Sequence, residues 1–372
     1  MMGKRILVKG YFKGNLGDDL FLKVLADRYP NETFEILVDP TVVSYYMSLK
    51  NVKIVKKNIW FKIVNKLTNV FSDGGIYTVL LRRYKAVVEI GGSIFPEKKR
   101  AGSVNTERLY LSKRMKHYFV IGSNFGPYET QEFLDSYRQF FSSIEGVVFR
   151  DTMSQKLFGS LNNVRYAPDV VLGLENEVKK NTENPYVAVS VIDLLYTDIS
   201  RNSALKKHAE YYENIILEAL VQLVDKGFDV KFVPFSKLQN DILISNKLKQ
   251  KLLTLRENAN VDILEEYSTE SILEVIKDSS YLLSTRYHAM ILGWVYGIKQ
   301  QVLSYSDKTE NVISDLFPQQ YHYVIGSGDK YSFDIEKMNT AQPIEELSTK
   351  AQEQFYYLDR YLYKDSVEGI NE

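Results

Sequence analysis

Short apolar runs alternate with longer amphipathic segments along most of this chain. In the first half the apolar runs predict strands at 5–10, 32–38, 86–90, 118–122, 146–149 and 164–167. Between the first two, the segment 18–29 carries Leu20, Phe21, Val24 and Leu25 at helical spacing. Strands that alternate with helices indicate a parallel sheet covered on both faces.

A polar segment without apolar periodicity, 175–185, is the predicted linker, and the alternation restarts after it. Strands are predicted at 186–191, 230–234, 261–264, 281–285 and 301–305, with helices at 211–225, 241–253, 268–277 and 289–296. We therefore predict an α/β fold of two Rossmann-like, doubly wound domains that face a cleft, an architecture that resembles the GT-B arrangement of glycosyltransferases. The predicted domains are 1–175 and 184–343, followed by a helical tail at 344–372. In such sheets, ligands bind outside the carboxyl ends of the strands.

Composition narrows the function. The 372 residues suit two domains, and the balance of 47 basic and 47 acidic residues argues against a general nucleic-acid binder. The absence of cysteine excludes disulfides and thiolate chemistry, and four histidines far apart in the sequence predict no metal site. No apolar run reaches about 18 residues, and the N-terminus is too short for a secretory signal, so a cytoplasmic protein is expected.

The loop at 10–19 follows the first predicted strand and contains Asn15, Gly17 and Asp18. Glycine permits close backbone approach to a ligand, and the next helix begins with N–H groups available for an anion. The loop matches neither a Walker A sequence nor G-x-G-x-x-G. Asp18 or Asp19 is either an N-cap or, alternatively, the base for a sugar hydroxyl.

Two further loops follow predicted strands. The first contains Gly91, Gly92 and Ser93, and the second contains Asn124. Each loop by itself is explained by tight-turn chemistry. Their joint placement at strand ends favours a binding role.

Arg150 ends a buried apolar strand, where an unpaired charge is costly. We expect it to bind a phosphate or a carboxylate. The alternative is a structural ion pair with Asp151, which also suits the cap of the helix near Ser154.

The segment Ser-Thr-Arg-Tyr-His-Ala at 284–289 ends a strand and opens a helix. It places Arg286, Tyr287 and His288 at a helix N-terminus, a combination that suits a dianionic phosphate. The alternative is a core histidine beside a surface arginine. Lys308 follows the next strand, where a lysine can also meet an anion.

The stretch 56–71 places Trp60, Ile63, Val64, Leu67, Val70 and Phe71 on one helical face, with lysines elsewhere and just before it. A basic amphipathic helix with such residues can lie on an anionic membrane. The alternative is a core helix with a solvated lysine face.

In order along the chain, these motifs resemble the polysaccharide pyruvyl transferase family. They are Gly-Asn-Leu-Gly-Asp at 14–18, Gly-Gly-Ser-Ile-Phe at 91–95, Gly-Pro at 126–127, Arg-Asp at 150–151, Ala-Pro-Asp at 167–169, Ser-Thr-Arg-Tyr-His at 284–288 and Tyr-Ser-Asp-Lys at 305–308. Many members carry a third glycine where this chain has Ser93.

The resemblance implies a GT-B-like fold, phosphoenolpyruvate as co-substrate and a hexose or hexosamine acceptor of a surface polysaccharide such as an exopolysaccharide or capsule, often lipid-linked. It maps the Arg-x-His pattern of the family to Arg286 and His288, and its Arg-Asp/Glu pattern to Arg150. Other substrate-binding candidates are Asn15, Gly17, Gly91, Gly92, Ser93, Asn124, Tyr287 and Lys308.

Ketal formation needs cations for phosphate and carboxylate, an acid and a base. We assign the phosphate to Arg286, His288 and the backbone at Tyr287, and the donor carboxylate or a share of the phosphate to Arg150. His288 is the candidate acid and Asp18 the candidate base. No metal or other cofactor is expected. Two alternatives remain: a GT-B glycosyltransferase that uses a nucleotide sugar, and a non-catalytic glycan-binding protein.

Overall fold

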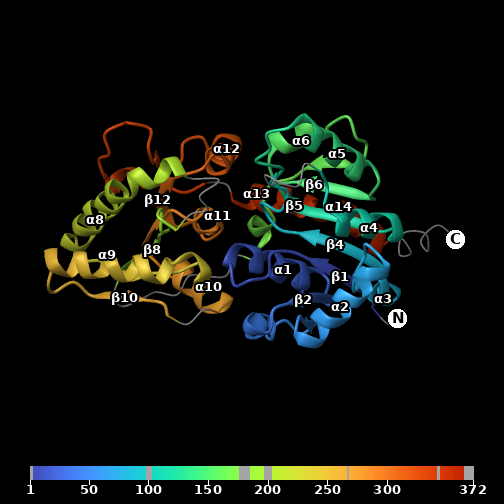
Figure 1. Cartoon of the computed structure of the whole chain (residues 1–372). Helices are drawn as coiled ribbons and strands as arrows, with labels where there is room; N and C mark the ends of the chain where they lie inside the picture. The colour runs from blue at the N-terminus through green and yellow to red at the C-terminus, as the bar shows by residue number, and fades with distance from the viewer. Residues whose placement is uncertain are drawn as a thin grey trace. The chain divides into compact units, whose positions relative to one another are not determined.

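The computed structural model describes residues 3–97, 103–175, 185–196, 203–265, 268–341 and 344–363. The chain divides into two compact units. The N-terminal unit contains residues up to Lys13, Asp18–Gly173 and the described residues from Thr349 onward, and the C-terminal unit contains Gly14–Gly17 and Leu174–Ser348 (Figure 1). The predicted linker lies almost wholly outside the described residues.

The N-terminal unit is built on a seven-stranded sheet in the order β3-β2-β1-β4-β5-β6-β7, with every neighbouring pair parallel. This is the doubly wound order, in which the chain reverses direction across the sheet after β3. The strands are β1 Arg5–Lys9, β2 Thr33–Val38, β3 Val52–Lys56, β4 Ala86–Ile90, β5 Tyr118–Ser123, β6 Gly146–Phe149 and β7 Val164–Tyr166.

The helices of this unit are α1 Leu16–Arg28, α2 Ile59–Phe71, α3 Tyr77–Leu80, α4 Thr106–Arg114, α5 Gln131–Ser142, α6 Thr152–Phe158 and α14 Tyr356–Leu362 (Figure 1). All residues of β4, β5 and β6 are buried, as expected for parallel strands covered on both faces. On one face, aromatic rings from α5, α6 and the strand-end loops pack edge to face; Phe125 and Phe158, for example, have centroids 4.8 Å apart.

The C-terminal unit repeats this order with six parallel strands, β10-β9-β8-β11-β12-β13. The strands are β8 Tyr186–Ser190, β9 Asp229–Phe232, β10 Val261–Ile263, β11 Tyr281–Ser284, β12 Lys299–Ser304 and β13 His322–Val324. The helices are α8 Ala209–Asp225, α9 Asp241–Leu255, α10 Thr269–Lys277, α11 Tyr287–Val295 and α12 Asp307–Leu316, with α13 Ile344–Gln352 leading back to the N-terminal unit.

The last described segment, 344–363, contacts the N-terminal sheet through Gln354. Gln354 lies between α13 and α14; its side-chain nitrogen donates to the carbonyl of Ala167 (2.6 Å), and its side-chain oxygen accepts from the backbone N–H of Gly122 (2.8 Å). The helical character predicted for this segment is therefore present, and its described residues complete the N-terminal unit.

The predicted α/β class with two doubly wound sheets is confirmed, and single elements differ in detail. Strands β3 and β13, each at or near a sheet edge, were not predicted, because neither carries a long apolar run. Helix α11 begins at Tyr287, two residues before its predicted start. Within the part of the chain that the structure describes, no helix is long and apolar enough to cross a bilayer.

Candidate functional site

Both sheets have a topological switch point, where connections from two adjacent strands leave in opposite directions. In the N-terminal unit this point lies between β1 and β4, and in the C-terminal unit it lies between β8 and β11. Ligands of doubly wound folds bind outside the carboxyl ends of the strands at this point. The predicted loops that follow β4 and β11 are therefore in the expected place.

In the N-terminal unit, Gly92 and Arg150 are in close contact. A Cβ atom added to Gly92 would lie 2.6–2.7 Å from the guanidinium atoms of Arg150. Such a distance is shorter than any carbon–nitrogen van der Waals contact, so only glycine allows the arginine to occupy this position. Two residues that are 58 positions apart in the sequence are thus matched to each other.

Arg150 is buried and holds the neighbouring loops together. Its Nη1 donates to Oδ2 of Asp169 (2.8 Å), and its Nη2 donates to Oδ1 of Asn124 (2.8 Å). The same Asn124 oxygen accepts from Oγ of Ser93 (3.0 Å). Three predicted or motif residues from three loops therefore form one hydrogen-bonded network with the arginine.

Arg150 does form a buried ion pair, as the alternative interpretation expected, and the structure gives Asp169 as a partner in it. The carboxylate that neutralises it belongs to Asp169, of the Ala-Pro-Asp motif. Asp151 caps α6, because its Oδ1 accepts from the backbone N–H of Ser154 (2.7 Å). If Arg150 binds a ligand, it does so while its guanidinium remains paired with Asp169.

Asp18 and Asp19 both lie within the first turn of α1, which begins at Leu16, and both are largely buried. Asp19 accepts a hydrogen bond from Oη of Tyr46 (2.6 Å). Asp18 lies beside the β4 loop: a Cβ added to Gly91 would lie 3.2 Å from its Oδ1. The N-cap interpretation does not fit either carboxylate, although both sit where the helix dipole favours a negative charge.

In the C-terminal unit, Arg286 precedes α11 and is held by two residues of the segment that follows β9. Its Nη2 and Nε donate to the two carboxylate oxygens of Asp241, the latter over 3.1 Å, and its Nη1 donates to Oε1 of Gln239. Arg286 is therefore already in a bidentate ion pair rather than a cation without a counter-charge.

Asp241 is fully buried and also accepts from the backbone N–H groups of Phe235 and Ser236, each over 3.0 Å. Burial alone would lower the pKa of Arg286, but the charge and hydrogen bonds of Asp241, together with Tyr305 and Tyr212, raise that pKa above its ordinary value. The guanidinium is charged at every accessible pH. Its position is determined by a carboxylate that two backbone N–H groups also hold.

The other predicted residues of this unit surround the start of α11. The rings of Tyr287 and His288 are 4.9 Å apart, and Nζ of Lys308 lies 5.4 Å from the centroid of the Tyr287 ring. Tyr305 is close by as well: burial raises its pKa, and the charge of Arg286 opposes that rise. Two cations, an imidazole and the N-terminus of a nine-residue helix are thus brought together.

The loop residues Gly14–Gly17 belong to this same unit. Asn15 forms a bridge with Ser236, and the backbone N–H of Leu16 donates to the carbonyl of Phe235 (3.0 Å). A Cβ added to Gly17 would lie 1.9 Å from Nδ1 of His288. Gly17 therefore leaves the space that the imidazole occupies.

Sequence reasoning missed Asp241 and Gln239 and did not count Asp169 among the site residues. Asp241 carried a usable signal, because an acid that opens a helix just after a strand lies at the ligand-binding edge of the sheet. Its pairing with an arginine 45 residues later could not be read from spacing. The described residues hold no cluster of acids and histidines suited to a metal ion.

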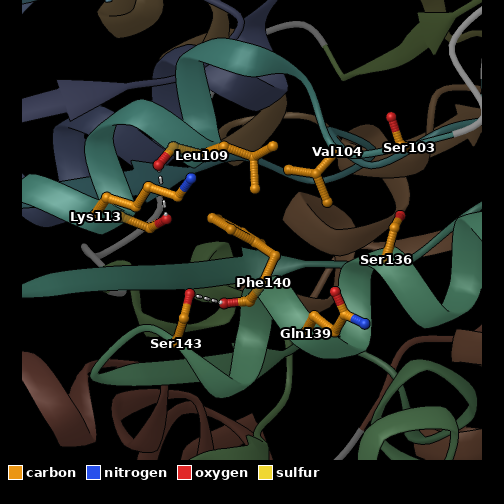
Figure 2. A pocket seen from close by; sticks show the side chains of 9 residues that line it. Ser103, Val104, Leu109, Lys113, Ser136, Gln139, Phe140 and Ser143 are labelled. Atoms are coloured by element: carbon orange, nitrogen blue, oxygen red, sulfur yellow. Dashed lines mark hydrogen bonds between the residues drawn. The ribbon is translucent and has the colours of Figure 1, made fainter.

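A surface pocket of about 420 Å³ lies elsewhere, between α4 and α5 of the N-terminal unit (Figure 2). Its lining combines four serines with a larger apolar surface, has Lys113 as its one charged residue, and includes none of the predicted site residues. With a single lysine, this pocket offers an anionic ligand fewer positively charged groups than the start of α11, where Arg286 and Lys308 lie.

Comparison with known proteins identifies one family and many solved structures that share this fold. The family model for polysaccharide pyruvyl transferase matches residues 15–307, whereas no curated protein matches this chain. Among solved structures, UDP-GlcNAc 2-epimerase from Methanocaldococcus jannaschii has a TM-score of 0.54 at 10% identity, covering 93% of this chain and 92% of its own.

Two more structures are similar to the same degree. Anabaena Alr3699/HepE in complex with UDP and glucose has a TM-score of 0.53 at 10% identity, covering 99% of each chain. The S. aureus MnaA–UDP co-structure has a TM-score of 0.52 at 12% identity, covering 95% of this chain and 87% of its own. At such low identity these likenesses concern the fold, which is an α/β, GT-B-like arrangement of two Rossmann-like units.

Proposed function

Because the chain belongs to the polysaccharide pyruvyl transferase family, we propose that it transfers a pyruvyl group from phosphoenolpyruvate to two hydroxyls of a hexose or hexosamine. The observation that supports this donor best is the cationic group at the start of α11, where Arg286, His288 and Lys308 accompany a helix N-terminus. A dianionic phosphate fits that set of groups.

The proposed reaction is balanced without a metal or a redox partner. One sugar hydroxyl adds to the central carbon of the enol while the terminal carbon takes up a proton and becomes a methyl group. A second hydroxyl then displaces phosphate from the same carbon and closes the ketal ring. Of the two protons that the hydroxyls lose, one ends on the methyl carbon and the other on the released phosphate.

In this scheme the start of α11 binds the donor phosphate. The backbone N–H groups of Tyr287 and His288 lie in the first turn of the helix, where its dipole favours an anion, and Lys308 supplies a positive charge nearby. Arg286 contributes a charge whose position Asp241 and Gln239 determine, so it needs no reorganisation when the donor binds. His288 is the acid that we propose for protonating the enol or the departing phosphate.

The N-terminal unit supplies the candidate base. Asp18 is a buried carboxylate in the first turn of α1, beside the β4 loop, and we propose that it removes a proton from an acceptor hydroxyl. The network of Ser93, Asn124 and Arg150 would give the acceptor side polar groups in fixed positions. A lipid-linked oligosaccharide precursor is the acceptor class that we propose.

The test is direct. Purified protein with phosphoenolpyruvate and a panel of galactose-, glucose- and mannosamine-containing acceptors should release inorganic phosphate and yield a product heavier by one pyruvate minus one water. His288→Ala and Lys308→Ala should lose phosphate release while keeping the melting temperature. Full turnover in both variants would rule out this donor site.

A nucleotide-sugar transferase is the second candidate, because solved structures of the same fold carry UDP. Thermal-shift measurements separate the two. Stabilisation by phosphoenolpyruvate and not by UDP-sugars supports pyruvyl transfer, and the reverse result supports glycosyl transfer. A glycan-binding protein without catalysis would be stabilised by the acceptor alone and would release no phosphate.

A further inference from the structure

Helix α2 of the N-terminal unit turns its apolar side outward. At about 100° per residue, the residues Ile59, Val70, Ile63, Leu67, Trp60, Phe71 and Val64 occupy one arc of about 140°. All seven are exposed, with Phe71 at 89%, Val70 at 73% and Trp60 at 71% of full exposure. No residue of α2 is buried, so the core-helix alternative from the sequence is wrong.

The side of α2 that faces the protein is narrow and mostly polar. Its half-buried residues are Phe61, Asn65 and Thr68, on a separate arc of about 60°. Asn65 accepts from the backbone N–H of Ile76 (2.9 Å), and Phe61 packs against the core. The helix is therefore attached to the unit through this narrow, mostly polar side, while its continuous apolar arc is exposed to solvent.

The side chains beside the apolar arc of α2 are mostly positively charged. Lys62 and Lys66 flank one edge of the arc, Lys56 and Lys57 precede the helix, and all four are exposed. Helix α2 itself contains no acidic residue. Acids near this surface are fewer: the charge of Asp39 interacts with Lys62 and Lys57, that of Glu107 interacts with Lys57, and the exposed Asp73 follows the helix. The surface thus combines apolar side chains, including an indole, with an excess of positive charge.

We infer that this α2 surface docks on an anionic lipid bilayer, with the helix lying parallel to the membrane plane. The apolar arc enters the interfacial region, where tryptophan is favoured, and the lysines meet anionic headgroups. A dry protein partner would satisfy the apolar arc equally well but would give the lysines no function. The docking does not depend on the proposed reaction.

A second copy of this chain is the less favoured occupant. A twofold contact through α2 would place the same lysines of two subunits at one interface, where like charges repel. An anionic bilayer neutralises those lysines and releases counterions. The two occupants also differ in salt dependence, because only the bilayer contact weakens as salt rises.

The experiment is sedimentation of the purified full chain with vesicles of phosphatidylcholine alone and of phosphatidylcholine with 30% (about one lipid in three) phosphatidylglycerol. We expect binding to the anionic vesicles and little to the neutral ones. Combined Trp60→Ser, Leu67→Ser and Phe71→Ser should lower the partition coefficient on the order of tenfold or more. Lys62→Gln with Lys66→Gln should lower it about fivefold per lysine.

Controls separate docking from folding. The altered side chains are exposed, so the melting temperatures should not change. Leu243→Ser with Leu255→Ser removes two exposed leucines of α9, 64% and 53% exposed, and should leave binding unchanged. Equal sedimentation of the wild type and the triple variant would overturn the inference. So would a concentration-dependent dimer that the triple variant abolishes, in a protein that does not bind anionic vesicles.

Discussion

Gly92 and Arg150 fit together so closely that a methyl group on Gly92 would come 2.6 Å from Nη2 of Arg150. The arginine in turn hydrogen-bonds to Asp169 and Asn124. Gly92 thus determines where the buried guanidinium of Arg150 can lie.

Gly92→Ala should displace Arg150 and loosen Asn124. We expect a loss of about 1–3 kcal/mol in the free energy of unfolding, because an added atom in a packed network forces neighbours to move. We expect the rate of phosphate release to fall by a larger factor than the loss of folded protein alone would explain. Gly159→Ala is the matched control, because the nearest contacts of its added Cβ lie at 3.4 Å. An unaltered melting curve for Gly92→Ala would contradict the contact.

Gly17 and His288 offer a test by a double-mutant cycle. Gly17→Ala should destabilise the wild type, because its Cβ would overlap Nδ1 of His288 at 1.9 Å. In a His288→Ala background the same change should cost much less, giving a coupling energy of about 0.5–3 kcal/mol. Chemical denaturation of the four proteins measures it. Equal costs in both backgrounds would show that the two residues are not in contact.

Removing Arg286 should be costly because it strands a buried carboxylate. Arg286→Ala leaves Asp241 without its counter-charge, and we expect a loss of about 3–5 kcal/mol in the free energy of unfolding. Arg286→Met combined with Asp241→Asn should recover much of that loss, since the amide oxygen still accepts from Phe235 and Ser236. If the double variant is stable but binds no phosphoenolpyruvate, the charge of Arg286 is needed to bind this donor.

Acid should destabilise the N-terminal unit through Glu89. Burial alone would raise the pKa of Glu89, but Arg108 lowers it to about 2, with further hydrogen bonds including that of Tyr118 at 2.7 Å. The carboxylate therefore contributes stability that is fully present above its ordinary pKa of 4.5 and is lost as the pH falls toward 2. The loss should be about 3 kcal/mol.

Urea unfolding measured at pH 6, 4.5 and 3 checks this dependence. Glu89→Gln should be less stable at pH 6, because it leaves Arg108 without a charged partner, and its stability should change less with pH. Glu132→Gln, an exposed carboxylate in the first turn of α5, should keep the wild-type dependence. A wild-type dependence in Glu89→Gln would assign the acid sensitivity to other groups.

Much of the fold could be predicted because it depends on local pattern. The buried strands β4 and β6 lie where their apolar runs predict, since a strand covered on both faces must be apolar throughout. Edge strand β13, with all residues half-buried, has no such signature. The strand-end position of Arg286 and His288 followed from the same alternation.

What the sequence by itself determined is the α/β class, the strand-end loops and the family that their order indicates. Only the tertiary structure decided which charges are paired: Asp169 with Arg150, and Asp241 with Arg286. It also decided that α2 faces outward, although its apolar periodicity would suit a core helix equally well. The physical reason is that periodicity records which side of an element is apolar, whereas partners and exposure depend on what the rest of the chain places against that side.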